Sequence, residues 1–306
     1  MREIIKDLGE VHVTESPDEL APLLERTLGS LECFVSDGGD GALHCALNAA
    51  WPICVARGLP LPPFLPTNGG TIDFVARKAG IRGDGATLVS RAVARMREGR
   101  SLSRIELDSL RLELRGEGDA FTRLGFAVAA GGIGNRFFDD YYASAAPSAG
   151  TIVSVISRTL ASLALGSLPG MPRGVGARAR RMFAPTHARV RIDGEEVPTL
   201  RHGGIHAGAF DVDLGGVVRV FPFAREPGAL HFQAGAISPA QIVRNLPNVL
   251  TGRAIQSSSM RDQRGERLSI EALGDELLKP VVDGEVYTDV REVQISAGPG
   301  VPIARP

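Results

Sequence analysis

The stretch Asp37-Gly38-Gly39-Asp40-Gly41 decides the fold, because it joins a short apolar run to a helical one. Residues 33–36 (Cys-Phe-Val-Ser) are typical of a buried strand, and residues 42–50 are typical of a helix. Glycines at a strand-to-helix turn let backbone N–H groups approach an anion, and the helix N-terminus adds about half a positive charge. The loop therefore predicts a phosphate-chain site, with an ordinary tight turn as the alternative.

A second glycine turn, Asn68-Gly69-Gly70-Thr71, lies about thirty residues further on, after an apolar run and before a helix expected at 72–79. A β run at 10–14 and a helix opened by Ser16 and Pro17 precede the first loop. Strands that alternate with helices favour a parallel sheet, in which both loops lie at one edge and face one nucleotide. We therefore expect an α/β nucleotide-binding domain over residues 1–103.

The pattern changes after residue 103, where residues 104–108 and 111–115 alternate strictly between apolar and charged side chains. Such alternation is typical of half-buried antiparallel strands. Further runs follow at 121–129, 188–192, 217–221 and 290–295, with helices expected at 151–168 and 239–251. The sequence predicts an α/β + β protein: a mostly antiparallel β-sandwich over 104–306 follows the α/β domain. Return of the last strand to the first domain stays open.

Composition excludes several classes of protein. With 34 Lys+Arg and 35 Asp+Glu, the net charge of -1 argues against bulk binding to nucleic acid. Three cysteines form neither a disulfide framework nor a zinc pattern, and the first ten residues contain no signal-peptide core. The longest apolar segment, 151–171, is interrupted by Arg158, so a buried or interfacial helix is expected there. We expect a cytoplasmic protein. No GxxxxGK[ST] loop is present, which excludes a Walker-type NTPase.

A third motif, Val282-Asp283-Gly284-Glu285, lies near the end of the β-rich half. Its plain interpretation is a hairpin turn, because Asp193-Gly194-Glu195 repeats the same three residues elsewhere in the chain. The motif gains weight only in combination with the two glycine loops.

Together, the GGDG loop, the GGT loop and the DGE motif resemble the diacylglycerol kinase family, which groups bacterial YegS-like lipid kinases with sphingosine and ceramide kinases. Residues 37–44 look like the family's GGDGT-[LI]-N segment, and residues 65–81 look like its PGGTMN…AR…GI segment. Residues 121–137 resemble its glycine-rich β segment, and residues 280–285 its DGE. The match is scattered over roughly residues 10–300.

The resemblance implies an ATP- and Mg²⁺-dependent lipid kinase with diacylglycerol or a related lipid as its acceptor. Glu285 is the implied base for the lipid hydroxyl, and Asp283 or Asp40 is implied to share that work or to help hold Mg²⁺. Phosphoryl transfer depends mainly on positioning and charge neutralisation, which backbone amides and Mg²⁺ can supply. The implied nucleotide-contacting residues are Thr14, Gly38, Gly39, Asp40, Gly41, Gly69, Gly70 and Thr71.

The chain departs from the family pattern at several positions. Ala42 stands where the family has Thr, His44 where it has Asn, and Asp73 where the GGTMN segment has Asn. The loop at 225–231 offers only Glu226 in place of an Asp-rich metal loop, so we expect no conventional structural metal there and leave the metal ligands unknown. The family's first strand and its Asn-Pro-x-Ser-Gly loop have no counterpart before residue 11.

These departures leave two alternatives open: a weakly active or inactive relative that binds lipid or nucleotide, and an NAD- or sugar-kinase-like enzyme. His202 and His206 have i,i+4 spacing, but the glycines between them argue against a helical metal pair. Expected partners are a lipid substrate and an anionic membrane surface on the inner face, with no nucleic acid. The candidate membrane-contacting residues are Arg173, Arg178, Arg180 and Arg181, with a solvated loop as the alternative.

Overall fold

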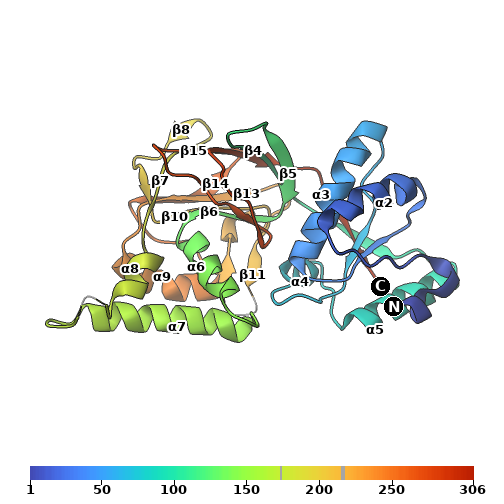
Figure 1. The fold of residues 1–306 in the computed structure, drawn as a ribbon, viewed down its shortest axis with the longest axis horizontal. Coiled ribbons are helices and arrows are strands. Elements are labelled where there is room, and N and C mark those ends of the chain that lie inside the picture. Colours follow the sequence, from blue (N-terminus) through green and yellow to red (C-terminus); the bar gives the residue numbers. More distant parts are fainter. Residues whose placement is uncertain (173, 215–217) are drawn as a thin grey trace. The chain divides into compact units, whose positions relative to one another are not determined.

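The computed structural model describes residues 1–172, 174–214 and 218–306, which form two compact units (Figure 1). Unit 1 comprises Met1–Ser109 together with Pro299–Pro306, and unit 2 comprises Leu110–Gly298. The division falls after Ser109 rather than after residue 103, because β3 (Ser103–Leu107) pairs antiparallel with β19 (Val301–Arg305) in the sheet of unit 1. Unit 2 is thus an insertion between β3 and β19.

Unit 1 has the predicted parallel core with helices around it. Its four-stranded sheet has the order β1-β2-β19-β3, and β1 (Phe34–Ser36) runs parallel to β2 (Phe64–Pro66). β19 also runs parallel to β2, so only β3 is antiparallel. The α-helices of this unit are α1 (Arg2–Ile5), α2 (Leu20–Thr27), α3 (Asp40–Arg57), α4 (Phe74–Lys78) and α5 (Gly85–Arg97).

The strand predicted at residues 10–14 is wrong. That segment lies between η1 (Lys6–Leu8) and η2 (Pro17–Glu19) without regular structure, and the side chain of Val13 is exposed. Among the described residues no strand pairs with this segment, and β propensity mainly reflects packing on a sheet. The helix start that follows is as expected, because the Ser16 hydroxyl accepts the Asp18 N–H and Pro17 is the first residue of η2.

Unit 2 has the predicted antiparallel β architecture. One sheet has the order β14-β13-β10-β6-β16-β17, and the other has the order β5-β4-β18-β15-β7-β8, with β9 also paired to β7. Four α-helices, α6 (Ile133–Tyr142), α7 (Ala149–Gly166), α8 (Ala177–Met182) and α9 (Pro239–Thr251), lie below these sheets in Figure 1.

The strands of unit 2 have the following bounds: β4 (Leu110–Arg115), β5 (Phe121–Gly125), β6 (Ala127–Gly132), β7 (Thr186–Ile192), β8 (Glu195–Glu196), β9 (Arg201–His202), β10 (Gly204–Gly208), β11 (Val212–Leu214), β12 (Val218–Val220), β13 (Leu230–Gly235), β14 (Met260–Gly265), β15 (Arg267–Ala272), β16 (Val281–Val282), β17 (Glu285–Val286) and β18 (Glu292–Ala297).

Alternation along the strands builds the core of unit 2. Leu110, Leu112 and Leu114 of β4 are fully buried, whereas the charged residues between them are exposed. Burial of each leucine stabilises the fold by roughly 2 kcal/mol. Strand β7 repeats this pattern from the other end of its sheet, with Ala188, Val190 and Ile192 buried.

Helix α7 is the longest apolar helix of unit 2 in the described part of the chain. Neither it nor any other described helix is both long and apolar enough to cross a bilayer.

Candidate functional site

The two glycine loops of unit 1 touch each other backbone to backbone. They follow β1 and β2, which are adjacent and parallel, so both begin at the carboxyl edge of the sheet. The Gly69 N–H donates to the Gly38 carbonyl at 3.1 Å. A Cβ atom built on Gly39 would lie 2.6 Å from the Cα of Gly70, so a side chain at either residue would force the loops apart. The structure therefore brings together the glycines that were predicted to hold a phosphate chain.

Some loop amides are used inside the protein, and others are not. The Gly38 N–H donates to the Thr67 hydroxyl at 3.2 Å, and the Gly70 N–H donates to the Asp73 carboxylate at 3.0 Å. Helix α3 begins after Gly39 without a side-chain cap, and Gly41 is its second residue. Because uncapped N-terminal amides attract anions, the first turn of α3 is the donor set best placed to hold phosphate.

Asp40 connects the two loops. Its two carboxylate oxygens accept the N–H groups of Phe74 at 3.0 Å and Val75 at 3.1 Å, so the side chain caps α4 from the first residue of α3. This contact satisfies two of the helix amides that would otherwise have no partner. Its predicted share in catalysis or metal binding stays a prediction.

Asp73 supplies the negative charge that the sequence predicts at the second loop. The residue has a positive φ of 50° and is buried, and burial raises the pKa of its carboxyl group. The hydrogen bond from Gly70 and the charge of Arg77 oppose this rise in the pKa. The Asp73 carboxylate thus accepts the Gly70 N–H, which a phosphate would otherwise approach.

The two predicted threonines lie in different surroundings. Thr71 is exposed directly after Gly70 in the second loop. Thr14 is exposed in the irregular segment before η2, and no hydrogen bond joins it to either loop within the described residues. Its nucleotide contact therefore stays a prediction.

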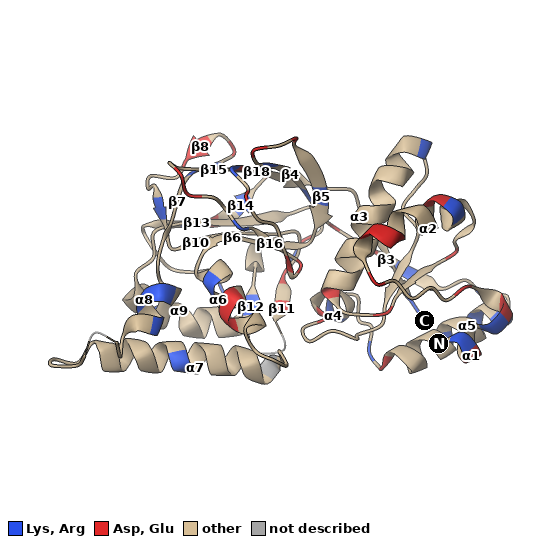
Figure 2. Cartoon of the chain, viewed as in Figure 1, with Lys and Arg blue, Asp and Glu red and all other residues tan. Residues whose placement is uncertain are grey.

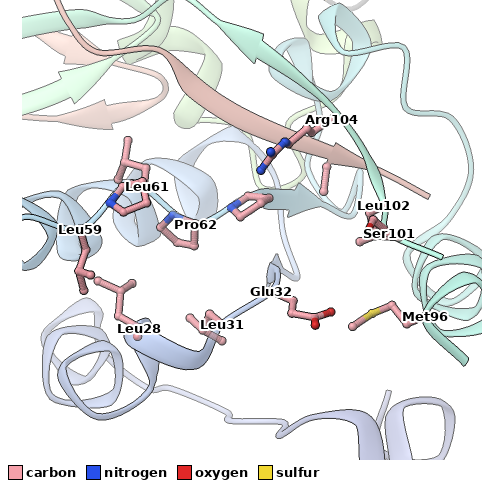
Figure 3. A pocket seen from close by; sticks show the side chains of 14 residues that line it. Leu28, Leu31, Glu32, Leu59, Leu61, Pro62, Met96, Ser101, Leu102 and Arg104 are labelled. Atoms are coloured by element: carbon pink, nitrogen blue, oxygen red, sulfur yellow. The ribbon is translucent and has the colours of Figure 1, made fainter. Parts of the chain in front are cut away.

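A pocket of about 560 Å³ lies elsewhere in unit 1 (Figure 3). It is lined by segments that directly precede β1 and β2, so it lies at the amino edge of the sheet, away from the glycine loops. Leucine and proline side chains form most of its wall, with Glu32 and Arg104 on opposite sides. No residue of the predicted nucleotide site lines it.

The DGE motif forms a hairpin turn in unit 2, between β16 and β17. Asp283 and Gly284 have φ values of 52° and 100°, as in the two-residue turns that join antiparallel strands. The Asp283 side chain is buried and accepts the N–H groups of Phe126 and Ala127, both at 2.9 Å. Sequence reasoning missed this structural role, because Phe126 lies 157 residues away along the chain.

Glu285 follows the turn as an exposed side chain of β17. Its side chain makes no hydrogen bond or ion pair in the part of the chain that the structure describes. An exposed carboxylate on a hairpin fixed by Asp283 is available to accept a proton from a bound hydroxyl group.

The other sequence candidates have structural partners. The buried ring of His202 contacts the Ala188 carbonyl, whereas His206 contacts Gln233, and no metal-type cluster of three or more side chains occurs among the described residues. Arg178 and Arg181 both pair with Asp140, so they are partly neutralised. Arg173 lies outside the described residues.

The loops fit the nucleotide that the fold implies better than they fit its metal. The bare glycine backbones and the uncapped first turn of α3 suit a phosphate chain. For Mg²⁺ the fit is poor, since Asp40 and Asp283 each already accept two backbone amides and no cluster of carboxylates adjoins them in the described residues. We therefore assign no step to a metal.

Comparison with solved structures identifies the fold. A proposed diacylglycerol kinase from Bacillus anthracis superposes with a TM-score of 0.63 at 14% sequence identity, covering 97% of this chain and 85% of that one. Two further structures described as diacylglycerol kinases of that organism give TM-scores of 0.58 and 0.54 at 14% and 13% identity, with similar coverage. No protein-family model and no curated protein matches the sequence. The chain therefore has the fold of these kinases, as the three motifs predicted.

Proposed function

We propose that the chain transfers the terminal phosphoryl group of ATP to the hydroxyl group of a lipid, with diacylglycerol or a related lipid as the acceptor. The observation that carries the proposal is the backbone contact between Gly39 and Gly70 at the carboxyl ends of two parallel strands. Such a contact leaves no room for a side chain at either residue. A phosphate site lined by the backbone of these loops would explain why both residues are glycine. The shared fold with solved diacylglycerol kinases supports the lipid class of acceptor.

Each residue has a defined role in this proposal. The first turn of α3 holds the phosphates, and its N–H groups offset the charge on the transferring group. The Gly69–Thr71 loop lies against the first loop, and its Gly69 and Gly70 N–H groups already donate to Gly38 and Asp73. ATP, when bound, supplies the phosphoryl group. Glu285 accepts the proton of the attacking hydroxyl through its carboxylate oxygen, and Asp283 positions Glu285 by fixing the hairpin.

Ala42→Glu tests the phosphate site without disturbing the fold. Ala42 is exposed in the first turn of α3, where a carboxylate stabilises the helix but repels phosphate. We expect ATP affinity measured by calorimetry to fall at least about tenfold, equivalent to about 1.4 kcal/mol. Ala240→Glu is the matched control, because it places the same charge in the first turn of α9 in unit 2. Equal ATP affinity in both variants would remove the phosphate site from this loop.

A binding role without phosphoryl transfer is the second candidate. The observation that favours it is the Asp73 carboxylate on the Gly70 amide, which opposes a phosphate at the second loop. Incubation with radiolabelled ATP and a panel of diacylglycerol, ceramide, NAD and sugars separates the candidates. Label in a lipid product supports the kinase, and ATP binding without any labelled product supports the binding protein. Label in NAD or a sugar supports the remaining alternative.

We also propose that the protein works in the cytoplasm. Cys33, Cys45 and Cys54 form no disulfide in the described part of the chain, which suits a reducing compartment. Fractionation of cells that express the chain would test this location.

A further inference from the structure

We propose that the outer face of α7 and the loop after it dock onto an anionic membrane surface. We call this surface the α7 face; its apolar members are Val153, Leu165, Leu168 and Met171. The inference concerns a surface of unit 2 alone and does not depend on phosphoryl transfer.

Helix α7 has a buried side and an apolar exposed side. Ile152, Val155, Thr159 and Ser162 are buried at helical spacing and face the rest of unit 2. On the other side, Val153 and Leu165 keep 50% and 47% of their surface exposed. A helix that packs on one side only usually presents several charged residues to water, whereas α7 presents Arg158 among apolar, small and hydroxyl side chains.

The loop beyond α7 extends this apolar surface. Its sequence is Leu168-Pro169-Gly170-Met171-Pro172, and Figure 1 shows it projecting past the end of the helix. Leu168 and Met171 are 50% and 45% exposed. About half of the surface of each side chain is therefore open to solvent, and such apolar side chains can enter the interfacial layer of a bilayer.

The charged residues on α7, on α8 and in the segment between them are all basic. From residue 143 to residue 192 the chain contains no Asp or Glu, although the whole protein has a net charge of -1. Arg158 lies on the exposed side of α7, and Figure 2 shows no acidic residue on α7 or α8. Seven arginines fall in this acid-free stretch: Arg158, Arg173, Arg178, Arg180, Arg181, Arg189 and Arg191.

Helix α9, which lies on the same side of the sheets in Figure 1, repeats this combination. Residues 227–260 also lack Asp and Glu, and Val243 and Leu250 of α9 are exposed. Arg244 of α9 and Arg158 of α7 form no ion pair within the described residues. Their charges therefore remain available to an external anion, unlike those of Arg178 and Arg181, which pair with Asp140.

Exposed apolar side chains on helices that also carry an unpaired arginine fit an anionic bilayer better than a nucleic acid or an acidic protein. A nucleic acid would use the arginines but not Leu168 and Met171. A bilayer uses both, because interfacial binding adds apolar burial to attraction by anionic headgroups. The expected gain is about fivefold in affinity for each basic residue near the surface.

Flotation of the full chain with vesicles tests the proposal. The vesicles contain phosphatidylcholine with or without phosphatidylserine, and ATP is absent. Neither lipid carries an acceptor hydroxyl group, so the result does not depend on whether the chain is a kinase. We expect binding to the anionic vesicles and about 25-fold weaker binding for Arg158→Gln/Arg244→Gln, from two basic residues at about fivefold each. Leu168→Asp/Met171→Asp should lose at least as much, because it adds two acidic charges and removes two apolar side chains.

The matched control is Val13→Asp/Val55→Asp, which adds the same two charges at exposed valines of unit 1. It should bind anionic vesicles like the unmodified chain, and all variants should show the same thermal unfolding. Three results would overturn the proposal: no binding to anionic vesicles, equal loss in the control, or unchanged binding of Leu168→Asp/Met171→Asp. Competition by RNA together with that last result would point to a nucleic acid instead.

Discussion

Asp283 and Asp193 hold equivalent positions in the two sheets of unit 2. Each begins an Asp-Gly-Glu turn, and their φ values are 52° and 53°. Each carboxylate accepts two consecutive backbone N–H groups just beyond a glycine that ends a strand. Asp283 bonds Phe126 and Ala127 after Gly125, and Asp193 bonds Glu266 and Arg267 after Gly265.

The strand order extends this equivalence to the whole sandwich. In the first sheet the turn follows the fifth strand, β16, and the partner Gly125 ends β5, the first strand of the second sheet. In the second sheet the turn follows the fifth strand, β7, and the partner Gly265 ends β14, the first strand of the first sheet. Val282 pairs with Val128 in the first sheet, and Ile192 pairs with Leu268 in the second. In both copies of the Asp-Gly-Glu motif the aspartate therefore has a structural role at the junction of the two sheets. The residue to test for a catalytic role is Glu285, the glutamate of one copy.

Glu285→Gln and Glu195→Gln form a matched pair for testing that role. Glu195 pairs with Arg261 at 2.9 Å, whereas Glu285 has no such partner among the described residues. We expect Glu285→Gln to lower the rate of lipid phosphorylation by roughly 10²–10⁴, the usual contribution of a general base, and to leave ATP affinity nearly unchanged. Glu195→Gln should change neither. Similar rates in the two variants would show that Glu285 is not the base.

Asp283→Asn should destabilise unit 2 more than Asp193→Asn does. Asparagine accepts the positive φ, but its amide group cannot replace both charge-assisted hydrogen bonds. Because Asp283 is 5% exposed, we expect a loss of about 2 kcal/mol in the free energy of unfolding. Asp193 is exposed, and its loss should stay below about 1 kcal/mol. Urea denaturation measures both, and equal losses would contradict the difference in burial.

Asp73→Asn should strengthen nucleotide binding. The substitution keeps an acceptor for the Gly70 N–H and tolerates the positive φ, but it removes a negative charge beside the phosphate site. We expect ATP to bind about tenfold more tightly, a gain of about 1.4 kcal/mol, in a calorimetric titration. Asp84→Asn is a suitable control, because Asp84 caps α5 at an exposed position. Weaker binding of ATP to Asp73→Asn would show that the carboxylate serves the nucleotide.

The raised pKa of Asp73 also predicts how the free energy of unfolding changes with pH. Burial raises the pKa of Asp73 above its ordinary value of 3.8, so the folded protein holds this proton more tightly than the unfolded chain does. The contribution of Asp73 to stability is therefore largest below pH 3.8 and falls as the pH rises through the raised pKa. The difference in unfolding free energy between the unmodified chain and Asp73→Asn should shrink over that range. A difference that grows with pH would contradict the raised pKa.

His206 should make unit 2 sensitive to acid. Burial lowers the pKa of its ring from 6.5 to about 4, although the hydrogen bond that Gln233 Oε1 accepts from Nδ1 opposes this fall in the pKa. The unfolded chain gains a proton first, so stability falls as the pH drops from 6.5 toward 4, by as much as about 3 kcal/mol. Urea denaturation at several pH values should show this loss, and His206→Gln should reduce it. His12→Gln, at an exposed position, should not.

The sequence predicted those elements whose structure depends on residues close together along the chain. The glycine loops, the helix start at Ser16 and the alternation of β4 follow from residues close in sequence, and the structure confirms these elements. Residues 10–14 have the composition of a strand, but a strand also needs a neighbour that the sequence does not reveal. The contact of Asp40 with α4 depends on residues 34 and 35 positions away, and the contact of Asp283 on residues more than 150 away. Such contacts leave no periodic signal.

Strand β19 sets the order in which the protein can be completed during synthesis. It lies between β2 and β3, so the sheet of unit 1 needs residues 301–305, which leave the ribosome after all of unit 2. The Ser109 hydroxyl donates to the Pro299 carbonyl across 190 residues, at the point where the chain returns. Until then β2 and β3 have an unfilled gap between them, and exposed strand edges favour aggregation. A released chain that lacks residues 299–306 should therefore contain a folded unit 2 and a unit 1 that depends on chaperones.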